Sequence, residues 1–138
     1  MQIVLKNKPG EKQKLLAALE SFSRDHQLAD SVLQAADLAL EEHLTNVMNY
    51  AHEDGREHDI LVRFETGPAL FIIEVEDDGK PFNPLEAAAV DPSMPLDQKP
   101  VGGLGIHLIR SFMDGVHYER RANRNVLRMT KRLGPPTG

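Results

Sequence analysis

Hydrophobic residues recur every three or four positions in three stretches of the chain, a spacing that predicts helices. In the second stretch, Leu33, Leu40 and Leu44 lie on one face. The third stretch ends at Gly115, a residue type that commonly closes a helix. The predicted helices cover residues 11–25, 29–51 and 104–115.

Shorter apolar runs bounded by turn residues predict five strands. The first, at residues 2–6, stands alone, and the other four form two hairpins. Gly67 and Pro68 mark the turn of the first hairpin, and residues 122–125 lie at the turn of the second. The predicted strands are QIVLK, DILVRFET and ALFIIEVED, followed by the two halves of VHYERRANRNVLRMTKRL.

The resulting order, β-α-α-β-β-loop-α-β-β, favours an α+β fold over a doubly wound one. Consecutive hairpins predict a mostly antiparallel sheet, and we expect a two-layer sandwich with the helices on one face. The chain shows no internal repeat and no linker, so we expect residues 1–138 to form a single domain. Residues 134–138 read Gly-Pro-Pro-Thr-Gly and are expected to form a disordered tail.

Residues 80–102 fit neither pattern and contain five of the nine prolines. A loop of about 20 residues is uncommon in a compact domain unless it is functional or disordered. Apolar residues, among them Phe82, Leu85 and Val101, are interspersed with the prolines. This composition favours a segment that packs against the domain part of the time, such as a lid, and leaves a disordered insertion as the alternative.

Composition and charge narrow the class of protein. The 138 residues suit one core, and 41% hydrophobic and 27% charged residues are typical of a globular protein. A net charge of −5 argues against direct nucleic-acid binding, although the arginines of residues 119–132 leave a local basic patch open. No apolar run approaches the roughly 18 residues of a membrane span, and the N-terminal apolar run is too short for a secretory signal. We therefore expect a cytoplasmic protein without membrane contact.

Neither cysteine nor histidine indicates a metal site. The chain has no cysteine, which excludes disulfides and thiolate ligands. Its six histidines form no HxxxH or HExxH pair, and we expect them at the surface or in loops.

Three short motifs carry candidate chemistry, and the first is on the second predicted helix. Glu42, Asn46 and Asn49 share a face of this helix, away from its apolar stripe. Such a polar face usually points to solvent. As a functional site, it would divide two tasks: the Asn46 amide oxygen suits Mg²⁺, and the Glu42 carboxylate can accept a proton from a hydroxyl or water.

The other two motifs are a DDG sequence at residues 77–79 and the glycine-rich VGGLGIHLI at residues 101–109. The first ends a hydrophobic strand, either as a surface turn or as an acid aimed into a pocket. In the second, backbone N–H groups at the start of a helix can approach an anion closely, and a flexible hinge is the alternative. The P-loop sequence GxxxxGK[ST] is absent, and the third glycine of the dinucleotide fingerprint is missing.

In this order and spacing, the three motifs resemble the N, G1 and G2 boxes of the GHKL ATPase superfamily. Within it, the chain is most similar to the small anti-sigma-factor serine kinases, the group that contains RsbW and SpoIIAB. The resemblance spans about residues 10 to 133 and implies the Bergerat ATP-binding fold. The stretches that carry it are LALEEHLTNVMNYAH, EDDGKPFNP and GGLGIHLIRSFMDGVHYER.

The resemblance implies a role for each matching residue. Asp77 would accept a hydrogen bond from the adenine amino group, and Gly79 would let the chain turn beneath the base. Asn46 would bind Mg²⁺, Glu42 would be the general base, and residues 84–101 would form the ATP lid. Glycine backbone amides at the start of the last helix would hold the phosphates. The other residues assigned to the ATP site are Asn49, Phe82, Gly102, Gly103, Leu104 and Gly105.

Two positions depart from the pattern of the superfamily. Tyr50 stands where many relatives carry a histidine, four residues after the metal-binding asparagine. A hydroxyl residue of a late strand commonly supports the adenine-binding aspartate. Here residues 123–126 read Asn-Arg-Asn-Val, and Thr130 lies too far along the strand. We therefore expect weaker adenine binding, or a water molecule in place of the hydroxyl.

As a function, the resemblance implies an Mg-ATP-dependent serine/threonine-protein kinase of the anti-sigma type, acting in transcription regulation. It would phosphorylate a serine of a STAS-domain anti-anti-sigma protein, sequester a sigma factor and form a homodimer. The alternative is a nucleotide-gated protein-binding module with little turnover, which needs the same pocket. A histidine kinase is not expected, because 138 residues leave no room for a dimerising helical hairpin with its phospho-accepting histidine.

Overall fold

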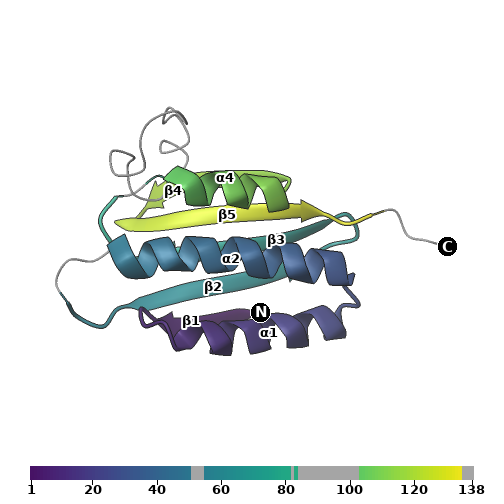
Figure 1. Cartoon of the computed structure of the whole chain (residues 1–138), viewed down its shortest axis with the longest axis horizontal. Coiled ribbons are helices and arrows are strands. Elements are labelled where there is room, and N and C mark those ends of the chain that lie inside the picture. The colour runs from purple at the N-terminus through teal and green to yellow at the C-terminus, as the bar shows by residue number, and fades with distance from the viewer. Residues whose placement is uncertain (51–54, 82, 84–102, 135–138) are drawn as a thin grey trace.

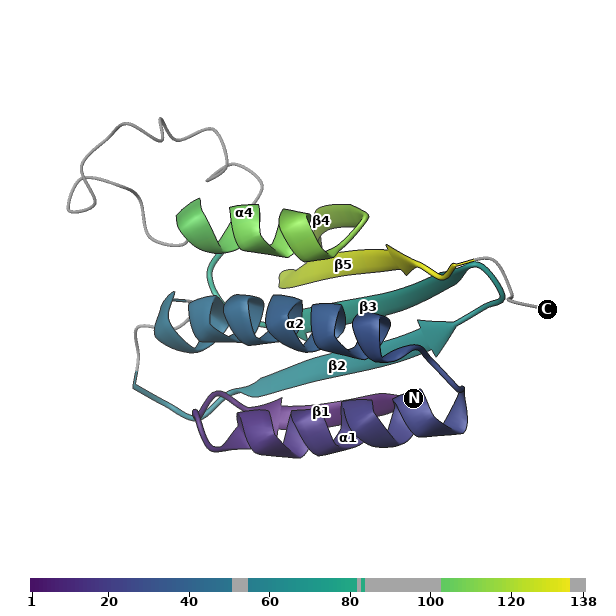
Figure 2. The same ribbon diagram turned by 45° about the vertical axis from the view of Figure 1, so that its right-hand side comes forward.

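The computed structural model describes residues 1–50, 55–81, 83 and 103–134, which form a two-layer α+β sandwich (Figure 1). One layer is a five-stranded sheet in the order β1-β2-β3-β5-β4, with every neighbouring pair antiparallel. The three helices of the described part of the chain cover one face of this sheet, and α2 lies between α1 and α4 (Figures 1 and 2). The elements are β1 (Gln2–Lys6), α1 (Glu11–Asp25), α2 (Asp30–Tyr50), β2 (Asp59–Thr66), β3 (Leu70–Asp77), α4 (Gly103–Phe112), β4 (Gly115–Arg121) and β5 (Arg124–Arg132).

The predicted fold class and order of elements are confirmed, with one difference at the end of α4. This helix stops at Phe112, and Gly115 is the first residue of β4 instead of the closing residue of the helix. Gly115 pairs with Thr130 of β5, whose Oγ1 would lie 2.5 Å from a Cβ at position 115. A glycine is therefore needed for close strand pairing at this position. The predicted lid (84–101) and residues 135–138 lie outside the described residues.

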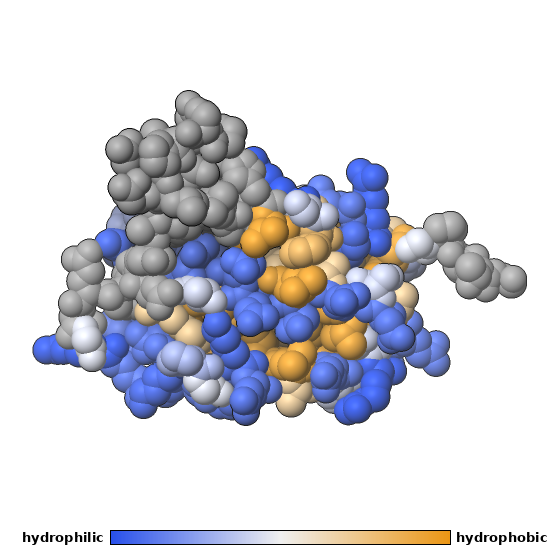
Figure 3. Space-filling model, in the orientation of Figure 1, coloured by the Kyte–Doolittle hydropathy of each residue, from blue (hydrophilic) through white to orange (hydrophobic). Residues whose placement is uncertain are grey.

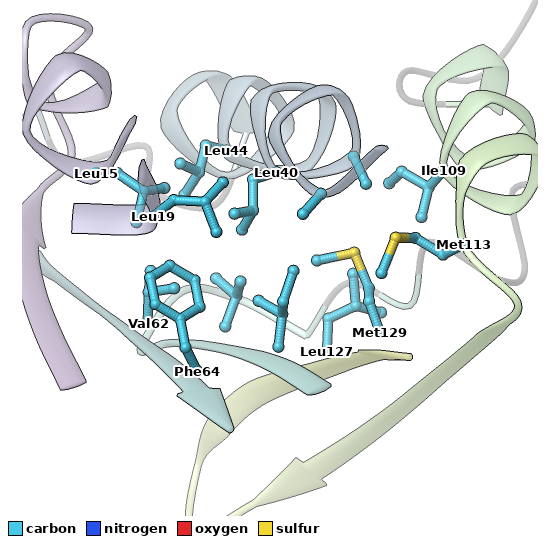
Figure 4. Packing of buried hydrophobic residues seen from close by; sticks show 14 of the residues in the cluster. Leu15, Leu19, Leu40, Leu44, Val62, Phe64, Ile109, Met113, Leu127 and Met129 are labelled. Carbon is cyan, nitrogen blue, oxygen red and sulfur yellow. The ribbon is translucent and has the colours of Figure 1, made fainter. Parts of the chain in front are cut away.

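The core lies between the sheet and the helices (Figure 4). Alternate residues of β2 and β3 point toward the helices and are fully buried, as period-two burial requires. The small side chains of Ala36 and Ala39 are also fully buried, which lets α2 approach the sheet closely. The helices contribute Leu15, Leu19, Leu40, Leu44, Ile109 and Met113 to this core, and the strands contribute Val62, Phe64, Leu127 and Met129.

Among the described elements, no helix packs on the opposite face of the sheet, which carries charged side chains. Glu74 lies 3.6 Å from Arg63 and 4.0 Å from Arg128, measured between carboxylate oxygen and guanidinium nitrogen. Glu76 pairs with Arg121 at 3.8 Å and Arg124 at 3.4 Å. Three arginines of the β4–β5 hairpin, Arg121, Arg124 and Arg128, are thus paired with acids of β3.

None of the helices in the described part of the chain is both long and apolar enough to cross a bilayer.

Candidate nucleotide-binding site

Segments that are far apart in the sequence meet at one end of the molecule. The C-terminal end of α2, the C-terminal end of β3 and the start of α4 all lie on the left in both ribbon views (Figures 1 and 2). The turn between β4 and β5 lies at the same end, because β5 pairs antiparallel with β3. The predicted motif residues belong to the first three of these segments.

Asp77 is the last residue of β3, and its side chain is only 2% exposed. Its Oδ1 accepts hydrogen bonds from the backbone N–H of Gly79 at 2.9 Å and from Asn125 Nδ2 at 3.0 Å. The neighbouring Asp78 is exposed, and its carboxylate lies 3.3 Å from His58 Nδ1. Of the two adjacent carboxylates, Asp77 is therefore the one that is buried and held in a fixed direction.

Asn125 of β5 connects Asp77 to its surroundings. Its Nδ2 also donates to the backbone oxygen of Lys80 at 2.8 Å. Its Oδ1 accepts hydrogen bonds from Tyr118 OH at 2.6 Å and from Arg120 Nη1 at 3.1 Å. Arg120 Nη1 in turn donates to the backbone oxygen of Gly79 at 2.8 Å. The β4–β5 hairpin thus holds both the carboxylate and the turn that follows it.

The support for Asp77 differs from the sequence expectation. A carboxamide, Asn125, contacts Asp77 directly, where we expected a water molecule or no support. The contact depends on register, because Asn125 is the direct partner of Asp77 in the β3–β5 ladder. Thr130 pairs with Ile72, five residues along the strand, and is too far away, as predicted. The tight turn at Ala122 and Asn123, with φ of 52° and 64°, is of the kind that fixes hairpin register.

Asn46 and Asp77 line the same small cavity beneath α2. About 10 Å³ of this cavity is available to the centre of a water-sized sphere, which is room for about one water molecule. Its walls come from α2 (His43, Asn46, Val47), from β3 (Asp77) and from the β4–β5 hairpin (Tyr118, Asn125, Leu127). The structure therefore brings the first two predicted motifs together at one place.

Two buried polar side chains of this cavity have no hydrogen-bond partner among the described residues. These are His43, at both ring nitrogens, and Asn46, at Nδ2. Burial lowers the pKa of His43 from 6.5 to about 4, so its ring is neutral at pH 7. The expectation of a surface histidine is wrong for His43, and Asn46 does not face solvent either, because α2 is covered by the sheet and flanked by α4.

The remaining motif residues are placed as follows. Glu42 is partly exposed on α2, one turn before Asn46. Asn49 is on the same helix, and its side chain is outside the described part of the structure. Phe82 and Gly102 lie outside the described residues altogether. The backbone of residues 103–105 forms the first turn of α4, which contains no acidic residue. An acid-free helix start suits an anion, since it leaves the partial positive charge of the helix uncompensated.

Sequence reasoning missed Asn125 and His43 as members of the site. His43 lies at helical spacing from Ala36, Ala39 and Leu40, so the apolar stripe of α2 already placed it on the buried face. Asn125 carries no comparable signal, because its contact with Asp77 requires the register of two strands that are 48 residues apart.

Comparison with known proteins shows the family of the chain. The model of the histidine kinase-like ATPase domain matches residues 5–131. The chain is 28% identical to the serine/threonine-protein kinase BtrW of Bordetella bronchiseptica over 98 residues, which cover 71% of this chain and 69% of BtrW. It is 28% and 30% identical to the serine-protein kinases RsbW of Bacillus subtilis and Bacillus velezensis, over 100 residues each. These matches cover 70% of this chain and 62% of each RsbW, so they span less than two thirds of the Bacillus proteins.

Two solved structures share the fold. The histidine kinase domain of the Erythrobacter litoralis EL346 blue-light activated histidine kinase aligns with a TM-score of 0.53 and 14% identity, over 90% of this chain and 60% of that chain. The Acinetobacter baumannii histidine kinase AdeS aligns with a TM-score of 0.50 and 15% identity, over 97% and 68% respectively. At this low identity, the likeness concerns the architecture alone.

Proposed function

This chain belongs to the family of histidine kinase-like ATPase domains, and on that basis we propose that it is an ATP-dependent serine/threonine-protein kinase of the anti-sigma type. Its similarity to the serine-protein kinases BtrW and RsbW supports this reaction. The structural observation that carries the proposal is the buried Asp77, which Asn125 holds in a cavity shared with Asn46.

In the proposed complex, Asp77 selects adenine. A carboxylate only accepts hydrogen bonds, so it favours the exocyclic amino group of adenine and disfavours the carbonyl oxygen that guanine has at the same place. The Gly79 N–H and the Asn125 amide hold the carboxylate in one direction, so little reorganisation is needed when the base binds. We therefore expect ATP to bind more tightly than GTP.

Asn46 is the proposed Mg²⁺ ligand. Mg²⁺ prefers oxygen ligands and keeps several waters, so one amide oxygen together with nucleotide phosphates makes a suitable set. The described residues contain no cluster of three acidic, histidine or cysteine side chains that would hold a metal without a nucleotide. The donor set thus fits an ion that arrives with ATP, and the bound ion would neutralise charge on the phosphates.

Phosphoryl transfer would use Glu42 and the start of α4. The oxygen of a partner's serine attacks the γ-phosphorus, the bond from that phosphorus to the β,γ-bridging oxygen breaks, and ADP leaves. Glu42 takes the hydroxyl proton, a role that its partial exposure allows. Backbone amides of Gly103 and Gly105 stabilise the phosphate charge at the helix N-terminus.

The proposed protein substrate is a STAS-domain anti-anti-sigma protein, with a sigma factor as a second partner and a homodimer as the working assembly. The resemblance of the three motifs to those of anti-sigma kinases supports these partners. Light scattering of the purified chain, alone and mixed with each candidate partner, measures the assembly directly.

The test uses γ-³²P-ATP with the candidate STAS protein and locates phosphoserine by mass spectrometry. Glu42→Gln is expected to keep the dissociation constant for ATP within about threefold and to slow transfer by at least about 100-fold, because general base catalysis contributes 10²–10⁴. Asp77→Asn is expected to weaken ATP binding by about 100-fold, since it places an amide where an acceptor is needed.

The control is Glu65→Gln, an exposed acid of β2, which should change neither binding nor transfer. Transfer at the wild-type rate by Glu42→Gln would remove Glu42 from the mechanism. Tight ATP binding without transfer to any candidate protein would instead make the domain a nucleotide-gated binding module.

A further inference from the structure

A groove between α1 and α2 is open to solvent and has an apolar floor. Figure 3 shows apolar surface exposed on the helical face of the molecule. The groove has a volume of about 190 Å³ and shares no lining residue with the cavity that contains Asp77. Its floor is formed by the partly exposed Leu16 of α1 and by the outer edge of the core, where Leu15, Leu19, Leu40 and Leu44 are each at most 3% exposed.

The size of the groove argues for side chains as its occupants. Small-molecule sites usually measure about 300–1,000 Å³, and this groove is smaller and bounded by two helices. A groove of this kind has room for a few apolar side chains, which an amphipathic helix presents at regular spacing. We propose that the groove binds an amphipathic helix of a partner protein that carries lysine or arginine beside its apolar stripe.

The charge of the rim identifies the partner as basic. Asp37 and Glu41 both line the groove. Burial, followed by repulsion from Glu41 and Glu20, raises the pKa of Asp37. In the described ranges, none of these three carboxylates forms an ion pair with another side chain. Lys12, the cation at the rim, donates from Nζ to Thr45 Oγ1 at 2.6 Å. Cations supplied by a partner would therefore relieve repulsion that the folded chain leaves in place.

The same charges disfavour a second copy of this chain as the occupant. In a two-fold symmetric dimer through the groove, Asp37 and Glu41 would meet a rim with the same two acids and a single cation, Lys12, so each copy would bring more negative than positive charge to the interface. Like charges brought together at an interface oppose association. The occupant is thus a different protein, and its docking does not depend on the nucleotide site.

The experiment is a selection from displayed helices. A library of 14-residue amphipathic helices keeps leucine on one face and places lysine, glutamate or glutamine at each flanking position. The full chain, biotinylated at Gly134→Cys because it has no native cysteine, is used for sorting. Helices with flanking lysines are expected to be enriched, and the best one is synthesised as a labelled peptide for anisotropy titration.

Glu41→Lys and Glu65→Lys form a matched pair, because both residues are exposed acids and both changes add two units of charge. Glu41→Lys is expected to raise the dissociation constant of the peptide by at least tenfold, and Glu65→Lys is expected to raise it by less than twofold. Amide shifts in NMR spectra should concentrate at Leu16, Leu40 and Glu41.

Three results would overturn the inference. The first is a selection in which no helix is enriched, or in which helices are enriched regardless of the charge of their flanking residues. The second is an equal loss of peptide affinity in Glu41→Lys and Glu65→Lys. The third is a wild-type dimer that Glu41→Lys abolishes, because a second copy of the chain would then be the occupant. Loss of kinase activity in any variant leaves the docking result unaffected, so the two proposals fail separately.

Discussion

Helix α2 contributes to two recesses that differ in nearly every physical property. On the sheet side, His43 and Asn46 line a small cavity with buried polar groups and space for about one water. On the α1 side, Leu40 and Leu44 form part of an open groove of about 190 Å³ with an apolar floor and an acidic rim. The cavity places polar side chains in the interior, which is usually apolar. The groove has apolar side chains in its floor, although the surface of a protein is usually polar.

The two recesses affect the stability of the fold in different ways. The cavity buries polar atoms of His43 and Asn46 that no described residue satisfies. Such exceptions to polar satisfaction are typical of functional sites. The groove leaves little apolar surface in water, because Leu15, Leu19, Leu40 and Leu44 are at most 3% exposed and belong to the core. Changes in the cavity should therefore affect folding and ligand binding strongly, and changes of the charged residues at the rim of the groove should affect mainly association.

The largest expected effect on stability concerns His43 and pH. The pKa of His43 is about 4 in the folded chain and 6.5 in its ordinary state, so between these values the unfolded chain binds the proton and the folded chain does not. Stability is therefore complete above pH 6.5 and falls as pH decreases toward 4, by about 3 kcal/mol for a shift of this size.

Urea unfolding at pH 7 and pH 4.5 measures this fall. His43→Leu should abolish most of this loss of stability between pH 7 and pH 4.5, whereas His117→Gln, at an exposed histidine of β4, should keep it. An equal loss of stability in wild type and His43→Leu would show that the ring is not held in its neutral form by burial.

A smaller effect is expected for Asn125. Asn125→Ala removes a donor from Asp77 and leaves Tyr118 and Arg120 without this acceptor, so we expect a loss of about 2 kcal/mol in the free energy of unfolding. Tyr118→Phe removes one of these bonds and should cost about 1 kcal/mol. Calorimetric melting measures both, and a loss below 0.5 kcal/mol for Asn125→Ala, on the order of a surface change, would mean that the network does not hold Asp77.

The smallest effect, with the opposite sign, is expected in the groove. Asp37→Asn removes a carboxylate that burial and the neighbouring Glu41 and Glu20 disfavour, so it should raise stability by up to about 0.5 kcal/mol. The matched change Glu65→Gln on β2 should leave the melting temperature unchanged. If Asp37→Asn lowered the free energy of unfolding by more than about 1 kcal/mol, beyond the usual range of surface changes, Asp37 would be a structural residue. The groove would then affect stability as the cavity does.

The periodicity of apolar residues was sufficient to predict every described helix and strand and their order. Those signals are local, because helices and strands bury one face at a characteristic spacing. The boundary that differed most, at Gly115, depends on a contact with Thr130 from another strand. The resemblance of the motifs assigned the adenine-binding role to Asp77 and not to Asp78, and Asp77 is the buried one of these two carboxylates.

By itself, the sequence determined the α+β class, the antiparallel hairpins and the three motifs, since all of these depend on residues near one another along the chain. Only the tertiary structure decided that Asn125 supports Asp77, that His43 is buried, and that α1 and α2 leave a groove with an acidic rim. These features depend on strand register and on the distance between packed helices. Both are set by contacts between distant residues, which local periodicity does not encode.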